Sequence, residues 1–309
     1  MKRAAEVRAP PLRDGVAASR VGVGDDRFAT LLAFLVARFP TVADWPARLA
    51  RGDVLDANGR PLAADAPCVA GSLVWYWRDP PPEPRVPFDV ELLHQDEHLV
   101  VVDKPHFLPV IPSGRHLRET VLVQLRRQLG IAMLAPMHRL DRETAGVLVF
   151  TVRAGERGAY HALLRERAVT KVYEAIAPWR GDLALPIVAR HRLEKPDGAG
   201  FMQVRVVPGE PNAEALVELV ERVDDRRALY RLTPRTGRTH QLRVQMNALD
   251  LPIVGDRIYP TLWPEPAPDA PPDWSHPLQL LAREIAFADP VTGEPRRFAS
   301  RRRLALATD

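Results

Sequence analysis

Met137-His138-Arg139-Leu140-Asp141-Arg142-Glu143-Thr144-Ala145-Gly146 is a charged stretch between two apolar segments of the chain. Asp141 has Arg139 and Arg142 as close neighbours, and a nearby guanidinium favours the ionised form of a carboxylate. An ionised carboxylate suits a nucleophilic or electrostatic role better than a general-acid role. For such a loop taken alone, the alternative is an ordinary surface salt bridge or turn.

A second polar cluster, Arg235-Thr236-Gly237-Arg238-Thr239-His240-Gln241-Leu242-Arg243, leads into a segment that predicts a helix over residues 239–249. Thr236 or Thr239 can cap the start of this helix. His240 and Arg243 are three residues apart and share a helix face. Backbone amides at the helix start, together with Arg238, can hold a phosphate. The alternative is a solvated basic helix.

Together the two clusters resemble the RluA family of RNA pseudouridine synthases, whose pattern is H-R-L-D-x-x-T-[SA]-G followed by T-G-R-x-H-Q-[LI]-R-V. Three further stretches resemble family motifs in the expected order. They are Val102-Asp103-Lys104-Pro105 for a strand ending in [ND]-K-P, Lys171-Val172-Tyr173 for K-x-Y, and Pro252-Ile253-Val254-Gly255-Asp256 for P-[IL]-x-G-D. The resemblance covers residues 86–299.

The resemblance implies a set of site residues. Asp141 would be the essential aspartate, and Arg243 would pair with it. Tyr173 would stack on the target base and act as a base, and Arg139 would fill the gap that a flipped nucleotide leaves. Further substrate contacts are expected from His138, Leu140, Thr144, Lys171, Thr236, Gly237, Arg238, His240 and Gln241.

Three positions depart from the family pattern. Ala145 stands where serine is commonest, and Gln245 and Leu281 stand where histidine is usual. These positions support the site, so we interpret the differences as bearing on substrate identity rather than on activity.

The resemblance implies isomerisation of uridine to pseudouridine in structured ribosomal or transfer RNA. The carboxylate of Asp141 could attack the base, add at the anomeric carbon, or assist abstraction of the ribose 2′ proton, and the sequence does not choose among these routes. Because the isomerisation conserves every atom, no cofactor or metal is expected. The alternatives are a catalytically inactive RNA-binding or RNA-folding protein on the same fold and a glycoside hydrolase, which needs a second carboxylate.

The implied fold class is α+β, with a long, mostly antiparallel mixed sheet in the catalytic domain and a small α/β domain before it. We expect a loose tail over residues 1–20, a small domain over 21–79, a proline-rich linker over 80–85 and the catalytic domain over 86–309. The small domain weakly resembles an α-L RNA-binding module. It is either a degenerate RNA-binding unit, with Arg48, Arg51 and Arg60 as contacts, or a structural cap.

The periodicity also predicts individual elements. Helices are expected over 120–129 and 153–166, and strands over 88–93, 99–102, 146–152, 169–177 and 228–232. Residues 260–277 hold seven prolines and predict an irregular loop. His94-Gln95-Asp96-Glu97-His98 matches the H-x-x-E-H motif of zinc proteases. That motif binds zinc only on a helix, and here we expect a turn between strands.

Composition restricts the class further. The 309 residues carry 43 basic and 39 acidic side chains, a mild excess that permits a nucleic-acid partner without establishing one. Cys68 is the single cysteine, which excludes an internal disulfide or a multi-cysteine zinc site and fits a reducing compartment. No apolar run reaches membrane length. The resemblance implies structured RNA as the partner, and we expect a cytoplasmic monomer with no membrane or metal partner.

Overall fold

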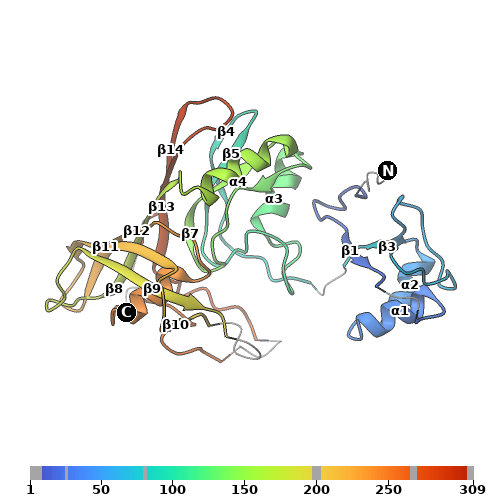
Figure 1. The fold of residues 1–309 in the computed structure, drawn as a ribbon, viewed down its shortest axis with the longest axis horizontal. Helices are drawn as coiled ribbons and strands as arrows, with labels where there is room; N and C mark the ends of the chain where they lie inside the picture. The colour runs from blue at the N-terminus through green and yellow to red at the C-terminus, as the bar shows by residue number, and fades with distance from the viewer. Residues whose placement is uncertain (1–8, 25–26, 79–81, 197–202, 265–269, 305–309) are drawn as a thin grey trace. The chain divides into compact units, whose positions relative to one another are not determined.

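Two units, Met1–Glu83 and Pro84–Asp309, make up the chain in the computed structural model (Figure 1). The structure describes residues 9–24, 27–78, 82–196, 203–264 and 270–304. Residues 80 and 81 of the predicted linker lie outside these ranges. Among the described residues, no helix combines the length and apolar character needed to cross a membrane.

The N-terminal unit is a three-stranded antiparallel sheet with two short helices. Its strands β1 (Ser19–Gly22), β2 (Val54–Leu55) and β3 (Leu73–Tyr76) are arranged in the order β1-β3-β2. Apolar residues of α1 (Leu31–Arg38) pack with Trp45 of α2 (Trp45–Ala50), which is fully buried. The unit therefore has a hydrophobic core of its own.

Two features of this unit bear on the predicted tail and on the RNA contacts considered for it. Residues 1–8 of the predicted tail lie outside the described ranges, and the part from residue 9 onward is not loose throughout, because β1 begins at residue 19 and Val16 is buried. Arg48 does not face solvent, since only 6% of it is exposed. Its guanidinium donates to Asp44 at 2.8 Å and to the carbonyl of Trp77 at 2.6 Å, so it cannot serve as an RNA contact.

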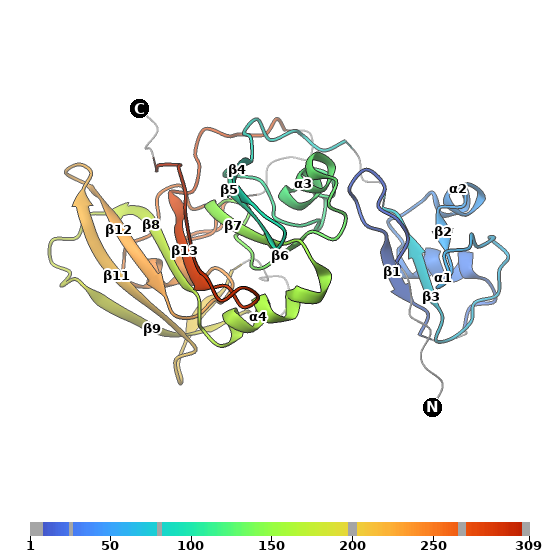
Figure 2. The ribbon, with the colours of Figure 1, turned by 90° about the horizontal axis from the view of Figure 1, so that it is seen from above.

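The second unit is built on an 11-stranded sheet with the order β10-β9-β11-β12-β8-β13-β7-β5-β4, to which β14 adds beside β13 and β6 beside β7. Figure 2 shows β11, β12, β8 and β13 side by side. The pairing of β13 with β7 is parallel, and the other pairs are antiparallel. The predicted α+β class with a long, mostly antiparallel mixed sheet is therefore confirmed. The strands are β4 (Glu91–Gln95), β5 (Leu99–Lys104), β6 (Ala135–Pro136), β7 (Ala145–Thr151), β8 (Thr170–Pro178), β9 (Ile187–Glu194), β10 (Arg205–Val207), β11 (Ala213–Arg222), β12 (Arg227–Pro234), β13 (Leu280–Ala288) and β14 (Pro295–Ala299).

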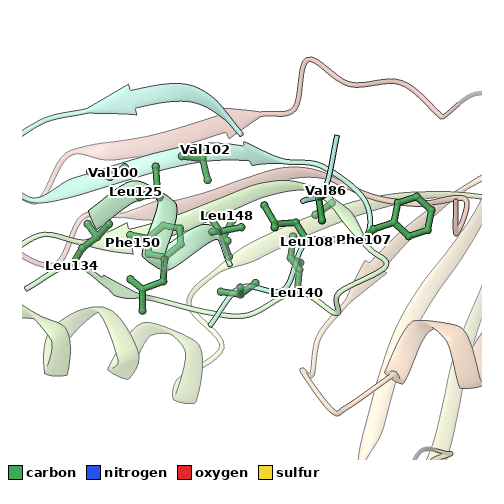
Figure 3. Close-up of a cluster of buried hydrophobic side chains, with 14 residues drawn as sticks. Val86, Val100, Val102, Phe107, Leu108, Leu125, Leu134, Leu140, Leu148 and Phe150 are labelled. Atoms are coloured by element: carbon green, nitrogen blue, oxygen red, sulfur yellow. The ribbon is translucent and has the colours of Figure 1, made fainter. Parts of the chain in front are cut away.

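Strand β5 is buried along its whole length because helices cover both of its faces. Successive side chains of a strand point to opposite faces. Val100 and Val102 belong to a core with Leu125 of α3 (Val121–Leu129), which Figure 3 shows in close-up. Leu99 and Val101 belong to a second core that includes the inner face of α4 (Arg157–Arg165).

Helix α5 (Gln241–Ala248) covers the other half of the sheet, where Leu242 and Met246 pack in a core with β8, β11 and β12. The helix is shorter than the predicted 239–249, and its N-cap is His240, without a side-chain cap bond. Neither Thr236 nor Thr239 caps it. The hydroxyl of Thr236 instead donates to the side chain of Gln241 at 2.7 Å.

The other predicted elements each overlap an observed one, with a short 3-10 turn, Ala154–Glu156, before α4. The H-x-x-E-H motif lies at the end of β4 and in the following turn and not on a helix, as predicted. His94 pairs there with Asp96 at 2.9 Å. Within the described ranges, no three histidine, cysteine or acidic side chains come together to hold a metal ion.

Candidate active site

A cleft of about 890 Å³ opens beside the sheet. Its lining residues come from segments that are far apart in sequence. They lie within residues 109–111, 138–144, 164–173 and 234–243, where Glu143 and Glu166 do not line the cleft, and include Asn212 and Leu280. The residues predicted for the site all line this cleft: His138, Arg139, Leu140, Asp141, Thr144, Lys171, Tyr173, Thr236, Gly237, Arg238, His240, Gln241 and Arg243. Their roles remain predictions.

Asp141 lies in the loop between β6 and β7, and its side chain is 31% exposed. The amide of Thr144 donates to the Asp141 carbonyl at 3.1 Å and closes the turn. Gly146 follows with φ +114°, and a Cβ there would lie 2.2 Å from the carbonyl oxygen of Ala282. Only glycine fits where β7 meets β13, which explains the glycine of the motif.

Lys104 connects the end of β5 to the loop that carries Asp141. Its side chain is completely buried at the end of β5, and Nζ donates to the carbonyl of Arg142 at 3.0 Å and to two carbonyls of the segment after β5 at 2.8 and 3.0 Å. These contacts use the three donors of an ammonium group. Burial lowers the pKa of Lys104 to about 7, against the opposing charges of Glu143 and Asp141.

Arg243 joins two carboxylates. Its Nη1 lies 3.2 Å from Oδ2 of Asp141, while Nε and Nη2 donate to Asp256 at 2.8 and 2.6 Å. Burial opposes the charge of Arg243, but the hydrogen bonds and charges of Asp256 and Asp141 outweigh it and raise the pKa of the guanidinium. A permanent cation therefore faces the Asp141 carboxylate.

Asp256 has no exposed side-chain surface. The backbone conformation of Gly255, the residue before it, determines its position. Gly255 has φ +76°, and a Cβ there would lie 2.4 Å from the carbonyl oxygen of Pro277. Oδ1 of Asp256 also accepts hydrogen bonds from the amides of Ile258 and Tyr259 at 2.8 and 3.1 Å. The sequence contained the G-D motif, but only the structure assigns Asp256 a partner.

Tyr173 lies in the middle of β8, opposite Leu232 of β12 and Ala282 of β13. Its ring packs against the two cores that α3 and α5 cover. Burial, with the charge of Asp141 as a second cause, raises the pKa of the Tyr173 phenol. The hydroxyl therefore keeps its proton at neutral pH, and any action as a base is favoured by alkaline pH.

Two of the predicted substrate contacts are occupied with the protein itself. Nε2 of His138 accepts a hydrogen bond from the amide of Val149 at 3.3 Å, and burial lowers the pKa of His138 to about 3, so the ring is neutral. Leu140 is 8% exposed and belongs to the core under α3. Both residues hold the Asp141 loop in place.

Gln241 organises the second motif. Its Oε1 accepts from the hydroxyl of Thr236 at 2.7 Å and from the amide of Arg238 at 3.1 Å, and its Nε2 donates to the carbonyl of Glu214 at 3.1 Å. These bonds tie the loop before α5 to β11. Gly237 in that loop lies against Lys171, since a Cβ there would be 3.5 Å from the ammonium nitrogen.

The cleft is strongly basic. Asp141 is the one acidic side chain among the described residues that line it. Arg165 and Arg167, which the motif analysis did not select, extend the basic lining from the end of α4. The basic lining residues are Arg139, Arg142, Arg165, Arg167, Lys171, Arg235, Arg238 and Arg243. Such a lining suits the phosphates of a nucleic acid.

Comparison with known proteins identifies this architecture. The family model described as RNA pseudouridylate synthase matches residues 98–248. The dual-specificity RNA pseudouridine synthase RluA of Escherichia coli K12 is 34% identical over 219 residues, which cover 69% of this chain and 94% of that protein. The chain belongs to the RluA family of RNA pseudouridine synthases. An uncharacterized RNA pseudouridine synthase of Synechocystis sp. is 32% identical over 220 residues, covering 70% of this chain and 73% of that protein.

Solved structures agree with the RluA-family assignment. Human RNA pseudouridylate synthase domain containing 4 aligns with a TM-score of 0.51 and 27% identity, over 68% of this chain and 88% of that chain. Human RNA pseudouridylate synthase domain containing 1 has a TM-score of 0.55 at 21% identity, over 71% and 86%, and shows the shared fold. This RluA-family protein is an isomerase that converts uridine to pseudouridine in RNA.

Proposed function

We propose that this synthase uses Asp141 as its essential carboxylate and modifies uridines in structured ribosomal or transfer RNA. One observation carries the proposal. Asp141 is the single acid among the described residues lining a basic cleft, and a buried arginine holds it there. The Escherichia coli relative is named a dual-specificity RNA pseudouridine synthase, which supports a test on more than one class of RNA.

The chemistry requires a positioned anion. The bond between N1 and C1′ breaks, a bond between C5 and C1′ forms, and the proton of C5 is exchanged for one on N1. Attack on the base, addition at the anomeric carbon and abstraction of the 2′ proton all need an ionised carboxylate held at one place. Arg243, oriented by Asp256, would keep Asp141 ionised and in position for each of these routes.

The target uridine must leave its stack, which costs a few kcal/mol. Stacking on the ring of Tyr173 would return about 1–3 kcal/mol. Arg139 has an exposed side chain at the cleft wall and would take the place of the flipped nucleotide. Arg165, Arg167 and Arg238 would contact phosphates and position the RNA.

A glycoside hydrolase is disfavoured by the same lining. Hydrolysis by paired carboxylates needs a second acid about 5–10 Å from the first and open to the substrate. Asp256, which shares Arg243 with Asp141, has no exposed side-chain surface and is bound to that arginine. Its carboxylate cannot reach a glycosidic bond.

The proposal is tested by tritium release from RNA labelled at C5 of uridine, with ribosomal and transfer RNA as separate substrates. Wild-type protein should release tritium, whereas Asp141→Asn and Asp141→Ala should be inactive and keep wild-type melting temperatures, because the side chain is partly exposed. Asp225→Asn removes an exposed aspartate paired with Arg222 and should behave as wild type. Turnover by Asp141→Asn contradicts the proposal, and RNA binding without tritium release by wild type supports an inactive RNA-binding protein instead.

A further inference from the structure

We infer that His240 is a positioning residue for Asp141: Tyr259 sets the hydrogen of its imidazole on Nε2, and Nε2 then supplies a second donor to the carboxylate oxygen that Arg243 contacts. The inference rests on the proposed function of Asp141. It assigns a role to His240 and specifies the tautomer in which His240 acts. It also specifies which oxygen of Asp141 faces the substrate.

Two nitrogen donors converge on one oxygen of Asp141. Nη1 of Arg243 lies 3.2 Å from Oδ2, and Nε2 of His240 lies 3.9 Å from the same atom. The second distance shortens to a hydrogen bond with a movement of less than about 1 Å, as catalytic contacts commonly do when the substrate binds. Among the described residues, no hydrogen bond is made to Oδ1, so Oδ1 is the oxygen presented to the uridine.

The position of the hydrogen on His240 follows from its neighbour. Oη of Tyr259 accepts a hydrogen bond from the amide of Val204 at 2.7 Å. Burial raises the pKa of Tyr259 to about 12, so the hydroxyl keeps its hydrogen and needs an acceptor. Nδ1 of His240 lies 3.2 Å from this hydroxyl. With Nδ1 as acceptor, the hydrogen of the neutral imidazole lies on Nε2, the nitrogen that faces Asp141.

Burial favours the neutral imidazole. It lowers the pKa of His240, helped by the charges of Arg243 and Lys195 and opposed by those of Asp141 and Asp256. The ring stands edge-on to Tyr259, at 86° between the planes. The arrangement therefore presents a donor without a second cation beside Asp141.

The backbone of His240 is held in an uncommon conformation. Its φ of +53° is in the left-handed region, which a non-glycine residue adopts only when its surroundings require it. The residue caps α5 with its backbone and makes no side-chain cap bond. Left-handed residues of this kind are found preferentially at functional sites, where they direct a side chain. Here the ring lies between Tyr259 and Asp141.

The tautomer is tested directly by NMR on the full-length protein labelled with ¹⁵N-histidine at pH 7.5, where two-bond ¹H–¹⁵N couplings distinguish the two ring nitrogens. The His240 signals are assigned by their loss in His240→Asn. Wild type should show the hydrogen on Nε2, and Tyr259→Phe should show a mixture of both tautomers. Tyr230→Phe also removes a buried hydroxyl, which donates to a backbone carbonyl, and should leave the His240 signals unchanged. A hydrogen on Nδ1 in the wild-type protein overturns the inference.

The positioning role is tested by kinetics. The side-chain nitrogen of glutamine reaches the place of Nε2, whereas that of asparagine reaches only the place of Nδ1. His240→Asn should lower kcat about 10- to 100-fold, the range for losing one hydrogen bond to a charged group, with the KM for RNA unchanged. His240→Gln should recover at least half of that loss on a logarithmic scale. His161→Gln, on the exposed side of α4, is the matched control and should keep the wild-type kcat.

The outcomes separate this inference from the function on which it rests. Wild-type kcat in His240→Asn, while Asp141→Asn is inactive, contradicts the inference alone. A higher KM with unchanged kcat also contradicts it, because it assigns His240 to RNA binding. Activity in Asp141→Asn instead removes the proposed function.

Discussion

Asp256 accepts both hydrogen bonds from one edge of the Arg243 guanidinium, from Nε at 2.8 Å and from Nη2 at 2.6 Å. Both side chains are buried, Arg243 to 2% exposure and Asp256 to none. A bidentate pair fixes the plane of a guanidinium as well as its position. The direction of the third nitrogen, which faces Asp141, is therefore set by an acid with no exposed side-chain surface.

Asp256→Asn should disorient Arg243 and leave its charge only partly paired. We expect a loss of kcat of at least about 100-fold, and a loss of about 3 kcal/mol in the free energy of unfolding, as when one partner of a buried ion pair is removed. Enzyme kinetics and urea denaturation measure the two effects. Asp273→Asn breaks an exposed pair with Arg257 at 3.0 Å and should cost less than about 1 kcal/mol. Equal behaviour of the two variants would contradict the assignment.

Tyr173→Phe and Tyr173→Ala should differ in RNA binding and agree in catalysis. Phenylalanine keeps the stacking face, so Tyr173→Phe should bind RNA as wild type does. Tyr173→Ala should lose about 1–3 kcal/mol of RNA-binding free energy. If the hydroxyl is the implied base, both should lose at least about 100-fold in kcat. Because the pKa of Tyr173 is raised, the basic form becomes more abundant as pH increases, so wild-type kcat should rise from pH 6 to 9. An equal kcat for Tyr173→Phe and wild type would exclude proton transfer.

Lys104→Met should change how stability depends on pH. The pKa of Lys104 falls from 10.5 in the unfolded chain to about 7 in the folded protein, so the unfolded state binds more protons between these values. The free energy of unfolding of wild type should therefore increase relative to Lys104→Met as pH rises from 7 towards 10, by at most about 1.4 kcal/mol per unit. Urea denaturation at several pH values measures the difference.

Arg139→Ala should discriminate between structured and unstructured RNA. If the guanidinium fills the gap left by a flipped nucleotide, kcat/KM should fall about 10- to 100-fold on a hairpin. A short linear oligonucleotide has no stack to refill and should be modified almost as well as by wild type. Arg297→Ala removes a 75% exposed arginine on β14 and serves as control. Equal losses on both RNAs would assign Arg139 to phosphate binding.

A chain that starts at Pro84 should keep Asp141, Tyr173 and Arg243 in a folded unit with the wild-type rate at saturating RNA. Each lost phosphate contact lowers the slope of log affinity against log salt by about 0.7–0.9. Arg48 is buried and Arg51 pairs with Asp53 at 3.0 Å. We therefore expect the slope to change by no more than the amount that corresponds to one phosphate contact. A larger change supports an RNA-binding N-terminal unit, and early melting of the shortened chain supports a structural cap.

Motif chemistry made the main features of the site predictable from the sequence. Asp141, Tyr173 and Arg243 were selected because their residue types and order resemble those of a known family, and the structure brings them to one cleft. The α+β class followed from the same resemblance. Strands β9 and β11 were not predicted individually. Both carry charged residues on the solvent side, and the alternating burial of β11 is visible only once β9 and β12 pair with it.

Tertiary structure decided which of the charged groups meet in the cleft and which are buried elsewhere. Arg243 and Asp141 are 102 positions apart, and their contact depends on β7 and α5 reaching one cleft. Local sequence did not reveal the carbonyl of Trp77 at Arg48, the three carbonyls around Lys104 or the Tyr259 hydroxyl at Nδ1 of His240, because these partners come from distant or irregular segments. The sequence by itself determined which chemical groups the enzyme has. Folding determined their orientation and protonation, because both depend on burial and on hydrogen-bond partners that exist only when the sheet is assembled.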